Sequence, residues 1–258
     1  MTTSPQSRLV WITGAGKGIG RALTLKLVRD GWTVAASART EDDLMTLAQD
    51  AGSLQRRVMP YPLDITDSDA VQATLADIEG ELGEIDLAVL NAGTHQPTPI
   101  DDFSAEAFQK LMDVNVMGTV NCLEALLAQM RPRRRGRIAI VASVAGYRGL
   151  PTAAAYGASK AALINMAEAL KPELDGIGID LKLINPGFVK TPLTDRNTFP
   201  MPFLISAEEA ADCIHRGLQS RAFEIAFPFR FALIMKLLRI LPDRLFFAVT
   251  RRMVTDSQ

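Results

Sequence analysis

Short β-type runs alternate with longer helical stretches along the whole sequence, and this alternation constrains the fold more than any other feature. The runs that we predict as strands are Arg8–Thr13, Trp32–Ala38, Arg57–Pro62, Asp86–Leu90, Gly136–Ala142, Ile177–Ile184 and Phe223–Phe227. The stretches that we predict as helices are Gly18–Asp30, Glu41–Ala51, Asp67–Leu82, Ala105–Arg131, Thr152–Leu174 and Ala207–Gln219. Helices placed between successive strands are typical of a parallel sheet covered on both faces. We therefore expect an α/β fold with a doubly wound, seven-stranded parallel sheet.

Some helix boundaries are also marked in the sequence. Three predicted helices begin with a Ser/Thr-x-x-Asp/Glu pattern, in which the first side chain caps the helix. The pairs are Thr40 with Asp43, Thr66 with Asp69 and Ser206 with Glu209. Pro172 lies inside the predicted helix at 152–174, where a proline removes one backbone hydrogen bond. We expect a kink or an early helix end there.

Composition limits the class of protein. The 258 residues are 48% hydrophobic and 22% charged, which excludes a chain that is disordered throughout. The 28 Lys and Arg nearly balance the 29 Asp and Glu, so the basic excess typical of nucleic-acid binders is missing. Cys122, Cys213, His95 and His215 show neither a disulfide framework nor metal-ligand spacing. We expect a soluble, cytoplasmic protein without a metal, a signal peptide or a membrane-spanning segment.

A glycine-rich segment, Thr13–Gly20, stands between the first predicted strand and the first predicted helix, with the sequence TGAGKGIG. Glycines in such a loop let the backbone approach a pyrophosphate, while the helix N-terminus offers free N–H groups. A glycine cluster alone can be a simple turn, but its position between strand and helix predicts a dinucleotide site in a Rossmann fold. The residues that we assign to the cofactor here are Gly14, Lys17, Gly18, Ile19 and Gly20.

The end of the second predicted strand favours NADP(H) over NAD(H). An NAD enzyme places an acid in this region to bind the ribose 2′-hydroxyl, whereas this sequence has Arg39. The Arg39 guanidinium can pair with a 2′-phosphate, and Lys17 lies where it can reach the same group. Two alternatives stay open: both cations are ordinary solvated residues, or Glu41 binds the ribose. Glu41, however, belongs to the first turn of the next helix, where acids are expected in any case.

Further motifs follow the glycine loop. In chain order they are Asn91-Ala92-Gly93, Asn115, Ser143, Tyr156-x-x-x-Lys160 and Pro186-Gly187 with Thr191. Together with TGAGKGIG, they make the chain resemble the short-chain dehydrogenase/reductase family from about Arg8 to Phe227. The resemblance implies a catalytic tetrad of Asn115, Ser143, Tyr156 and Lys160. It also implies cofactor contacts from Asp64, Ile65, Asn91, Ala92, Gly93, Tyr156, Lys160, Pro186, Gly187, Val189 and Thr191.

The chemistry of the tetrad can also be argued from the residues. Tyr156 and Lys160 lie four residues apart in a predicted helix, so they share one face, and an ammonium there lowers the tyrosine pKa. Ser143 can donate a hydrogen bond to a substrate oxygen on which charge develops. The resemblance assigns acid/base catalysis to Tyr156, ribose binding to Lys160 and the anchoring of a relay water to Asn115. Taken singly, each residue also fits a structural role, just as Asp64 also fits a turn cap.

The segment after Pro186-Gly187 is rich in large apolar side chains. They are Phe188, Leu193, Phe199, Met201, Phe203 and Leu204. In the family that the chain resembles, this region covers the substrate, so the segment predicts a lipophilic ligand or a buried lid. The alternative is that these side chains only pack onto the core. His95 and Arg148 also stand near the motifs, either as substrate contacts or as ordinary surface residues.

A basic and apolar tail follows the last predicted strand, and we divide the chain into a catalytic domain at 1–227 and a tail at 228–258. The tail has one acid among residues 228–252, Asp243, and its basic residues there are Arg230, Lys236, Arg239, Arg244, Arg251 and Arg252. This pattern predicts an amphipathic helix that breaks at Pro242. Such a helix can lie on a membrane surface, cover the active site, bind another subunit, or simply dock with its cations in water.

These features lead to one main prediction of function. We expect an NADPH-dependent carbonyl reductase, or an alcohol dehydrogenase in the reverse direction, acting on a lipophilic small molecule. A 3-oxoacyl thioester reductase is the alternative enzyme, and an NADP-binding sensor is the alternative outside the enzymes. The alanine-rich helix around Tyr156 and the apolar helix from Ala105 further predict a homodimer or homotetramer.

Overall fold

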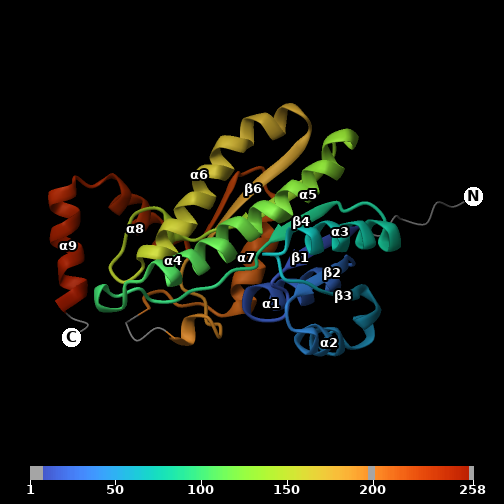
Figure 1. Cartoon of the computed structure of the whole chain (residues 1–258), viewed down its shortest axis with the longest axis horizontal. Coiled ribbons are helices and arrows are strands. Elements are labelled where there is room, and N and C mark those ends of the chain that lie inside the picture. The colour runs from blue at the N-terminus through green and yellow to red at the C-terminus, as the bar shows by residue number, and fades with distance from the viewer. Residues whose placement is uncertain (1–7, 197–200, 256–258) are drawn as a thin grey trace, which may run out of the picture.

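A computed structural model of the chain describes residues 8–196 and 201–255 (Figure 1). It contains one parallel sheet with the strand order β3-β2-β1-β4-β5-β6-β7. The strands are β1 Leu9–Thr13, β2 Thr33–Ala38, β3 Val58–Pro62, β4 Leu87–Leu90, β5 Gly136–Val141, β6 Ile179–Pro186 and β7 Glu224–Phe227. The order reverses between β1 and β4, which confirms the doubly wound α/β fold.

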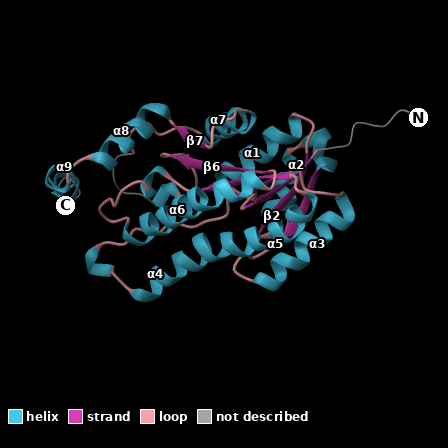
Figure 2. Cartoon of the chain, turned by 90° about the horizontal axis from the view of Figure 1, so that it is seen from above, coloured by secondary structure: helices cyan, strands magenta, loops and turns pink. Residues whose placement is uncertain are grey.

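Helices cover both faces of this sheet (Figure 2). They are α1 Gly18–Arg29, α2 Glu41–Asp50, α3 Ser68–Leu82, α4 Ala105–Met112, α5 Gly118–Arg133, α6 Ala154–Gly176, α7 Ala207–Gln219, α8 Phe229–Ile240 and α9 Asp243–Thr255. Trp11 of β1 packs into the core beneath α3, α5 and α6, whereas its neighbour Ile12 packs into the core beneath α1, α2 and α7. Successive strand residues therefore serve opposite layers, as expected for a sheet buried on both faces.

Two of the expected helix caps are wrong, although α2 begins at Glu41 as predicted. The side chain of Thr40 makes no capping hydrogen bond, and α3 is capped by Asp67, which accepts from the Ala70 N–H at 2.9 Å. Thr66 stands one residue before this N-cap and instead donates its hydroxyl and its N–H to Asp64. At Ser206 the expected capping box is present.

Pro172 does not end its helix early, since α6 continues to Gly176. The proline lies on the exposed side of α6, and Glu168, whose carbonyl it leaves without a donor, is also exposed to water. Solvent can therefore satisfy the carbonyl that the missing N–H leaves unbonded.

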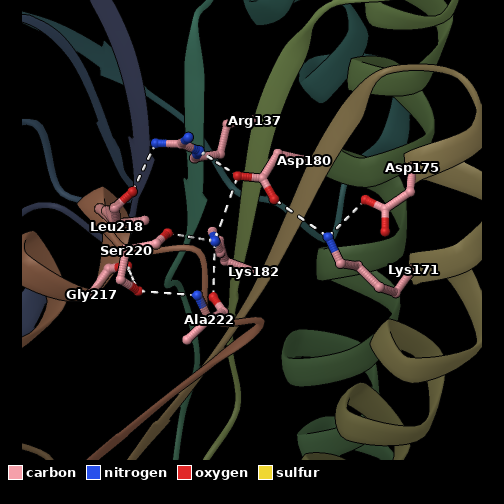
Figure 3. Close-up of polar contacts among 9 residues, drawn as sticks. All are labelled: Arg137, Lys171, Asp175, Asp180, Lys182, Gly217, Leu218, Ser220 and Ala222. Carbon is pink, nitrogen blue, oxygen red and sulfur yellow. Dashed lines mark hydrogen bonds and ion pairs between the residues drawn. The ribbon is translucent and has the colours of Figure 1, made fainter.

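The N-terminal ends of β5 and β6 are fixed by a network of charged side chains (Figure 3). Asp180 of β6 accepts from Arg137 of β5 at 2.7 Å and lies 3.4 Å from the ammonium of Lys171 on α6. The ammonium of Lys182, which is 2% exposed, donates to the carbonyls of Ser220 and Ala222 after α7. The network joins β5, β6, α6 and the loop after α7 at the edge of the sheet opposite the strand C-termini.

The helical stretch Ala105–Arg133, formed by α4, a π-helical turn (η3, Asp113–Met117) and α5, is long and apolar enough to span a membrane by length and composition. This differs from the expectation that no segment reaches that size. However, 44% of its most apolar window is buried inside the protein, and Cys122, Leu126 and Met130 belong to the main core. The stretch therefore acts as a core helix of this fold.

The tail forms two helices, α8 and α9, that separate at Pro242 as expected. Phe231, Ala232 and Met235 of α8 join the hydrophobic core, so α8 is anchored against the sheet. In Figures 1 and 2, α9 lies at the outer end of the molecule, beyond α8. The division of the chain at residue 227 stays a prediction.

Candidate active site

The glycine loop lies directly against the loop that follows β4. Gly14 and Gly18 adopt positive φ values of 66° and 53°, which favour glycine. A Cβ on Gly20 would lie only 2.2 Å from the carbonyl oxygen of Gly14. The side-chain amide of Asn91 donates to the carbonyls of Thr13 and Gly14 at 3.0 and 3.1 Å. These contacts hold the N-terminus of α1 open toward the C-terminal edge of the sheet.

A cleft of about 440 Å³ runs along this edge, past the ends of β1 to β6. Its lining includes almost all of the residues assigned from the sequence: Gly14, Lys17, Gly18, Ile19, Arg39, Asp64, Ile65, Asn91, Ala92, Gly93, Ser143, Tyr156, Lys160, Pro186, Gly187, Val189 and Thr191. Two assigned residues, Gly20 and Asn115, are not among the lining residues. The backbone cradle that closely packed glycines leave at the start of α1 fits a dinucleotide pyrophosphate.

The end of the cleft beside β2 contains a mixed set of charges. Arg39 is exposed there, and no ion pair within residues 8–196 and 201–255 includes it. The ammonium of Lys17 pairs at 3.0 Å with Asp43, from the first turn of α2. Asp43 is the expected partner of the Thr40 cap in the sequence, and no sequence pattern indicated that it lines the cleft. An acid at this position opposes an incoming phosphate, while Arg39 attracts one.

Ser143, Tyr156 and Lys160 meet on the opposite wall. Ser143 lies two residues after the end of β5, and its hydroxyl accepts from the Ala145 N–H at 3.1 Å, donates to the Pro186 carbonyl at 3.3 Å and lies beside the side chain of Tyr156. The Lys160 ammonium lies one turn along α6, 5.8 Å from the centre of the Tyr156 ring, and donates to the Val141 carbonyl at 3.0 Å. The arrangement places a hydroxyl donor, a phenol and an ammonium in one region of the cleft.

Burial shifts the titration of this wall. It raises the pKa of Tyr156, and the Ser143 hydroxyl beside the ring acts in the opposite direction. Burial also lowers the pKa of Lys160, from 10.5 to about 8. Each charged form is thus disfavoured by loss of water, so a phenolate needs positive charge beside it.

Asn115 lies in the π-helical turn and is fully buried. Its side-chain amide donates to the carbonyl of Thr94 at 3.0 Å and to the hydroxyl of Ser159 at 2.9 Å, and its oxygen accepts from the Thr94 N–H at 2.7 Å. Asn115 therefore ties the loop after β4 to α6, one residue before Lys160. The expected water relay stays a prediction.

Aromatic side chains lie next to the cleft, in contact with Tyr156 or just after Gly187. The ring of His95 packs edge-on against that of Tyr156, with centroids 4.6 Å apart. Phe188, just after Gly187, stacks on Phe231 of α8 at 5.3 Å, and Phe203 packs on the same ring at 6.0 Å. Within the apolar segment predicted from the sequence, Phe199 lies outside the described residues.

Arg148 does not line the cleft. Its guanidinium donates to the carbonyls of Leu238, Arg239 and Leu241 at the end of α8. It also pairs with Asp243 and lies over the ring of Phe246, 4.0 Å from the centroid. Arg148 thus fastens the tail to the loop that begins at Ser143.

Comparisons with known proteins agree with this geometry. A family model described as short chain dehydrogenase matches residues 8–199. An uncharacterized oxidoreductase of Myxococcus xanthus is 39% identical over 246 residues, which cover 95% of this chain and 97% of that protein. The 3-oxoacyl-[acyl-carrier-protein] reductase FabG of Thermotoga maritima is 34% identical over 191 residues, which cover 74% of this chain and 78% of that protein.

Two solved structures are similar over most of their length. A short chain dehydrogenase from Burkholderia cenocepacia, in complex with NADP, has a TM-score of 0.80 and 28% identity, covering 96% of this chain and 97% of that one. A short chain dehydrogenase from Mycobacterium paratuberculosis, bound to NAD, has a TM-score of 0.75 and 26% identity, covering 86% of this chain and 97% of that one. Similar folds thus bind either nicotinamide dinucleotide.

Proposed function

Because the chain belongs to the short-chain dehydrogenase family, we propose that it is an NADP(H)-dependent oxidoreductase that interconverts a carbonyl group and a secondary alcohol on a lipophilic substrate. The observation that carries this proposal is the meeting of Ser143, Tyr156 and Lys160 on one wall of the cleft, with the Lys160 ammonium 5.8 Å from the centre of the Tyr156 ring.

The residues of the wall divide the acid/base work. In the direction of reduction, the Tyr156 hydroxyl donates its proton to the substrate oxygen, and Ser143 donates a hydrogen bond to the same oxygen. The Lys160 ammonium, 5.8 Å from the centre of the ring, would stabilise the phenolate that remains. Asn115 is a positioning residue. Its hydrogen bonds fix the loop after β4 against α6, the helix that carries Tyr156 and Lys160. When bound, the nicotinamide supplies the hydride or accepts it.

The preference for NADP(H) rests on Arg39. An exposed guanidinium at the β2 end of the cleft suits a 2′-phosphate. Lys17 would contribute once the phosphate competes with Asp43 for its ammonium. The Burkholderia cenocepacia structure, which binds NADP, supports this preference.

The lipophilic substrate is supported by the aromatic residues beside the cleft. Phe188 adjoins Gly187 in the lining, and Leu193 belongs to the lining itself. The alternative substrate is a 3-oxoacyl thioester, which the similarity to the Thermotoga maritima reductase favours. The two substrates share the chemistry at the carbonyl and differ in whether the hydrocarbon part is free or is attached to a carrier through a thioester.

We also propose a homodimer or homotetramer formed through α6. The helix exposes small residues at helical spacing, Ala154, Ala158 and Ala161, which permit close approach of a second helix. Light scattering on the protein as it elutes from a size-exclusion column tests this oligomer, and a monomeric mass at micromolar concentration would contradict it.

The enzyme proposal is tested by NADPH oxidation with wild type and Tyr156→Phe. The panel contains apolar ketones, sterol and sphingoid ketones, and 3-oxoacyl thioesters. We expect turnover by wild type and a loss of at least about 1000-fold in Tyr156→Phe, with NADPH binding retained as the control for folding. Activity on thioesters alone would select the alternative substrate. NADPH binding without turnover of any compound would favour a cofactor-binding sensor.

A further inference from the structure

Helix α8 is apolar on both of its faces. Phe231, Ala232 and Met235 point into the core. On the other side, the large apolar residues exposed to solvent are Phe229, Leu233, Ile234, Leu237 and Ile240, with Phe229 and Ile240 each 76% exposed. Most of these positions are three or four residues apart, so they form one continuous stripe along the helix. Packing within the chain explains the first face and leaves the second unexplained.

Helix α9 repeats the pattern at the outer end of the molecule. Phe246 is buried beneath Arg148, and Thr250 is buried one turn later. Leu245, Val249 and Met253 are exposed at intervals of four residues. Exposed apolar side chains thus occur on both α8 and α9, and the two helices lie at the same end of the fold (Figures 1 and 2).

The charges around this surface are almost all positive. The one acid among residues 228–252, Asp243, is paired with Arg148, and Lys236 is paired with Glu224. Arg230, Arg239, Arg244 and Arg252 are exposed. A stripe of exposed apolar side chains flanked by arginines is typical of helices that lie in the interface of an anionic bilayer.

We propose that α8 and α9 together dock the protein on the surface of an anionic lipid bilayer. The apolar stripes would enter the boundary between headgroups and acyl chains, and the arginines would contact lipid phosphates. A second copy of the chain fits this surface less well, because a symmetric contact would bring the same arginines together. The docking does not depend on the proposed reaction, but it would bring a membrane-dissolved substrate toward Phe188 and Phe203, which pack on α8.

The experiment is co-sedimentation of the full-length protein with vesicles at low salt. One set of vesicles is phosphatidylcholine alone, and the other contains phosphatidylcholine with one third phosphatidylglycerol. Two variants give a matched comparison: Leu237→Glu changes a side chain on α8 that is 53% exposed, and Met45→Glu changes one on α2 that is 48% exposed. Thermal unfolding and NADPH binding confirm that both variants fold.

We expect wild type to bind the anionic vesicles, with Leu237→Glu at least tenfold weaker and Met45→Glu unchanged. Arg244→Gln should weaken binding about fivefold at low salt and have no effect at high salt, where the surface potential is screened. The proposal is overturned if wild type stays in the supernatant, or if both Glu variants bind equally. A change in oligomeric mass by Leu237→Glu without vesicle binding would overturn it in favour of a subunit contact.

Discussion

Replacing the ammonium of Lys160 should stabilise the protein while removing its activity. The ammonium is 5% exposed, and burial lowers its pKa from 10.5 to about 8. One pKa unit corresponds to about 1.4 kcal/mol, so keeping this group protonated at neutral pH costs the fold about 3 kcal/mol. Lys160→Met removes that cost and also loses the hydrogen bond to the Val141 carbonyl, which is worth about 1 kcal/mol. The expected gain in the free energy of unfolding is therefore about 2 kcal/mol at pH 7.

The pH dependence of this gain gives the sharper test. Below about pH 8 the lysine is protonated in both the folded and the unfolded states, so the full cost is present in wild type. Between about pH 8 and 10.5 the unfolded state binds more protons than the folded state, so wild type gains stability as the pH rises. The advantage of Lys160→Met should therefore shrink through this window and become a deficit of about 1 kcal/mol above it, because only the lost hydrogen bond to the Val141 carbonyl remains.

Urea unfolding of both proteins without cofactor, at pH 7 and at pH 9.5, measures the difference. A variant that is less stable than wild type at pH 7, or a difference that does not change with pH, would refute the reasoning, because either result means that the buried ammonium is well compensated. NADPH turnover of the variant is the functional control, and we expect none above background.

Three further changes test other parts of the structure. Arg39→Ala should weaken NADPH binding by about tenfold or more, or about 1.4 kcal/mol, and leave NADH binding unchanged in a fluorescence titration; equal losses would remove Arg39 from the phosphate site. Asp180→Asn should destabilise the fold by about 3 kcal/mol in urea at pH 7, because it leaves the ammonium of Lys182 buried without its carboxylate. Burial alone would raise the pKa of Asp180, but Arg137 and its neighbouring cations hold that pKa below the ordinary value. The difference in stability between wild type and Asp180→Asn should therefore be lost only as the pH falls through the lowered pKa. A difference that persists in strong acid would contradict the role of the Asp180 carboxylate. Arg148→Ala should speed tryptic cleavage within α9 several-fold at an unchanged melting temperature of the core, and an unchanged digestion pattern would show that the tail is held by other contacts.

The fold could be read from the sequence because its signals are local. Each strand was located within two residues, since a short β-type run stands between two helical patterns. TGAGKGIG predicted the dinucleotide cradle because its signal is also local: a Cβ on Gly14 or Gly20 would clash with atoms of the same loop or of the loop beside it. Ser143, Tyr156 and Lys160 were identified from the resemblance to a family, and the structure brings all three together in one region of the cleft.

The features that escaped prediction depend on contacts between distant segments. The place of Asp43 in the cleft depends on how the first turn of α2 lies against the glycine loop. The role of Arg148 depends on carbonyls about 90 residues further along the chain, which no local pattern marks. The π-helical turn that positions Asn115 likewise follows from packing against Thr94 and Ser159, because helix propensity alone would predict a regular helix.

The loop that begins at Ser143 is held at its other end by the tail. Tyr147 is buried and donates its hydroxyl to Glu224, which also pairs with Lys236 of α8, and Arg148 binds the end of that helix. Any ligand or surface that displaces α8 therefore acts on the same loop from which Ser143, in the proposed reaction, would donate to the substrate oxygen. Linkage then requires reciprocity: if engagement of the tail changes substrate affinity by some factor, substrate must change the affinity of the tail for its partner by that same factor. The two ends of one short loop would make this enzyme's catalytic state and its location thermodynamically inseparable.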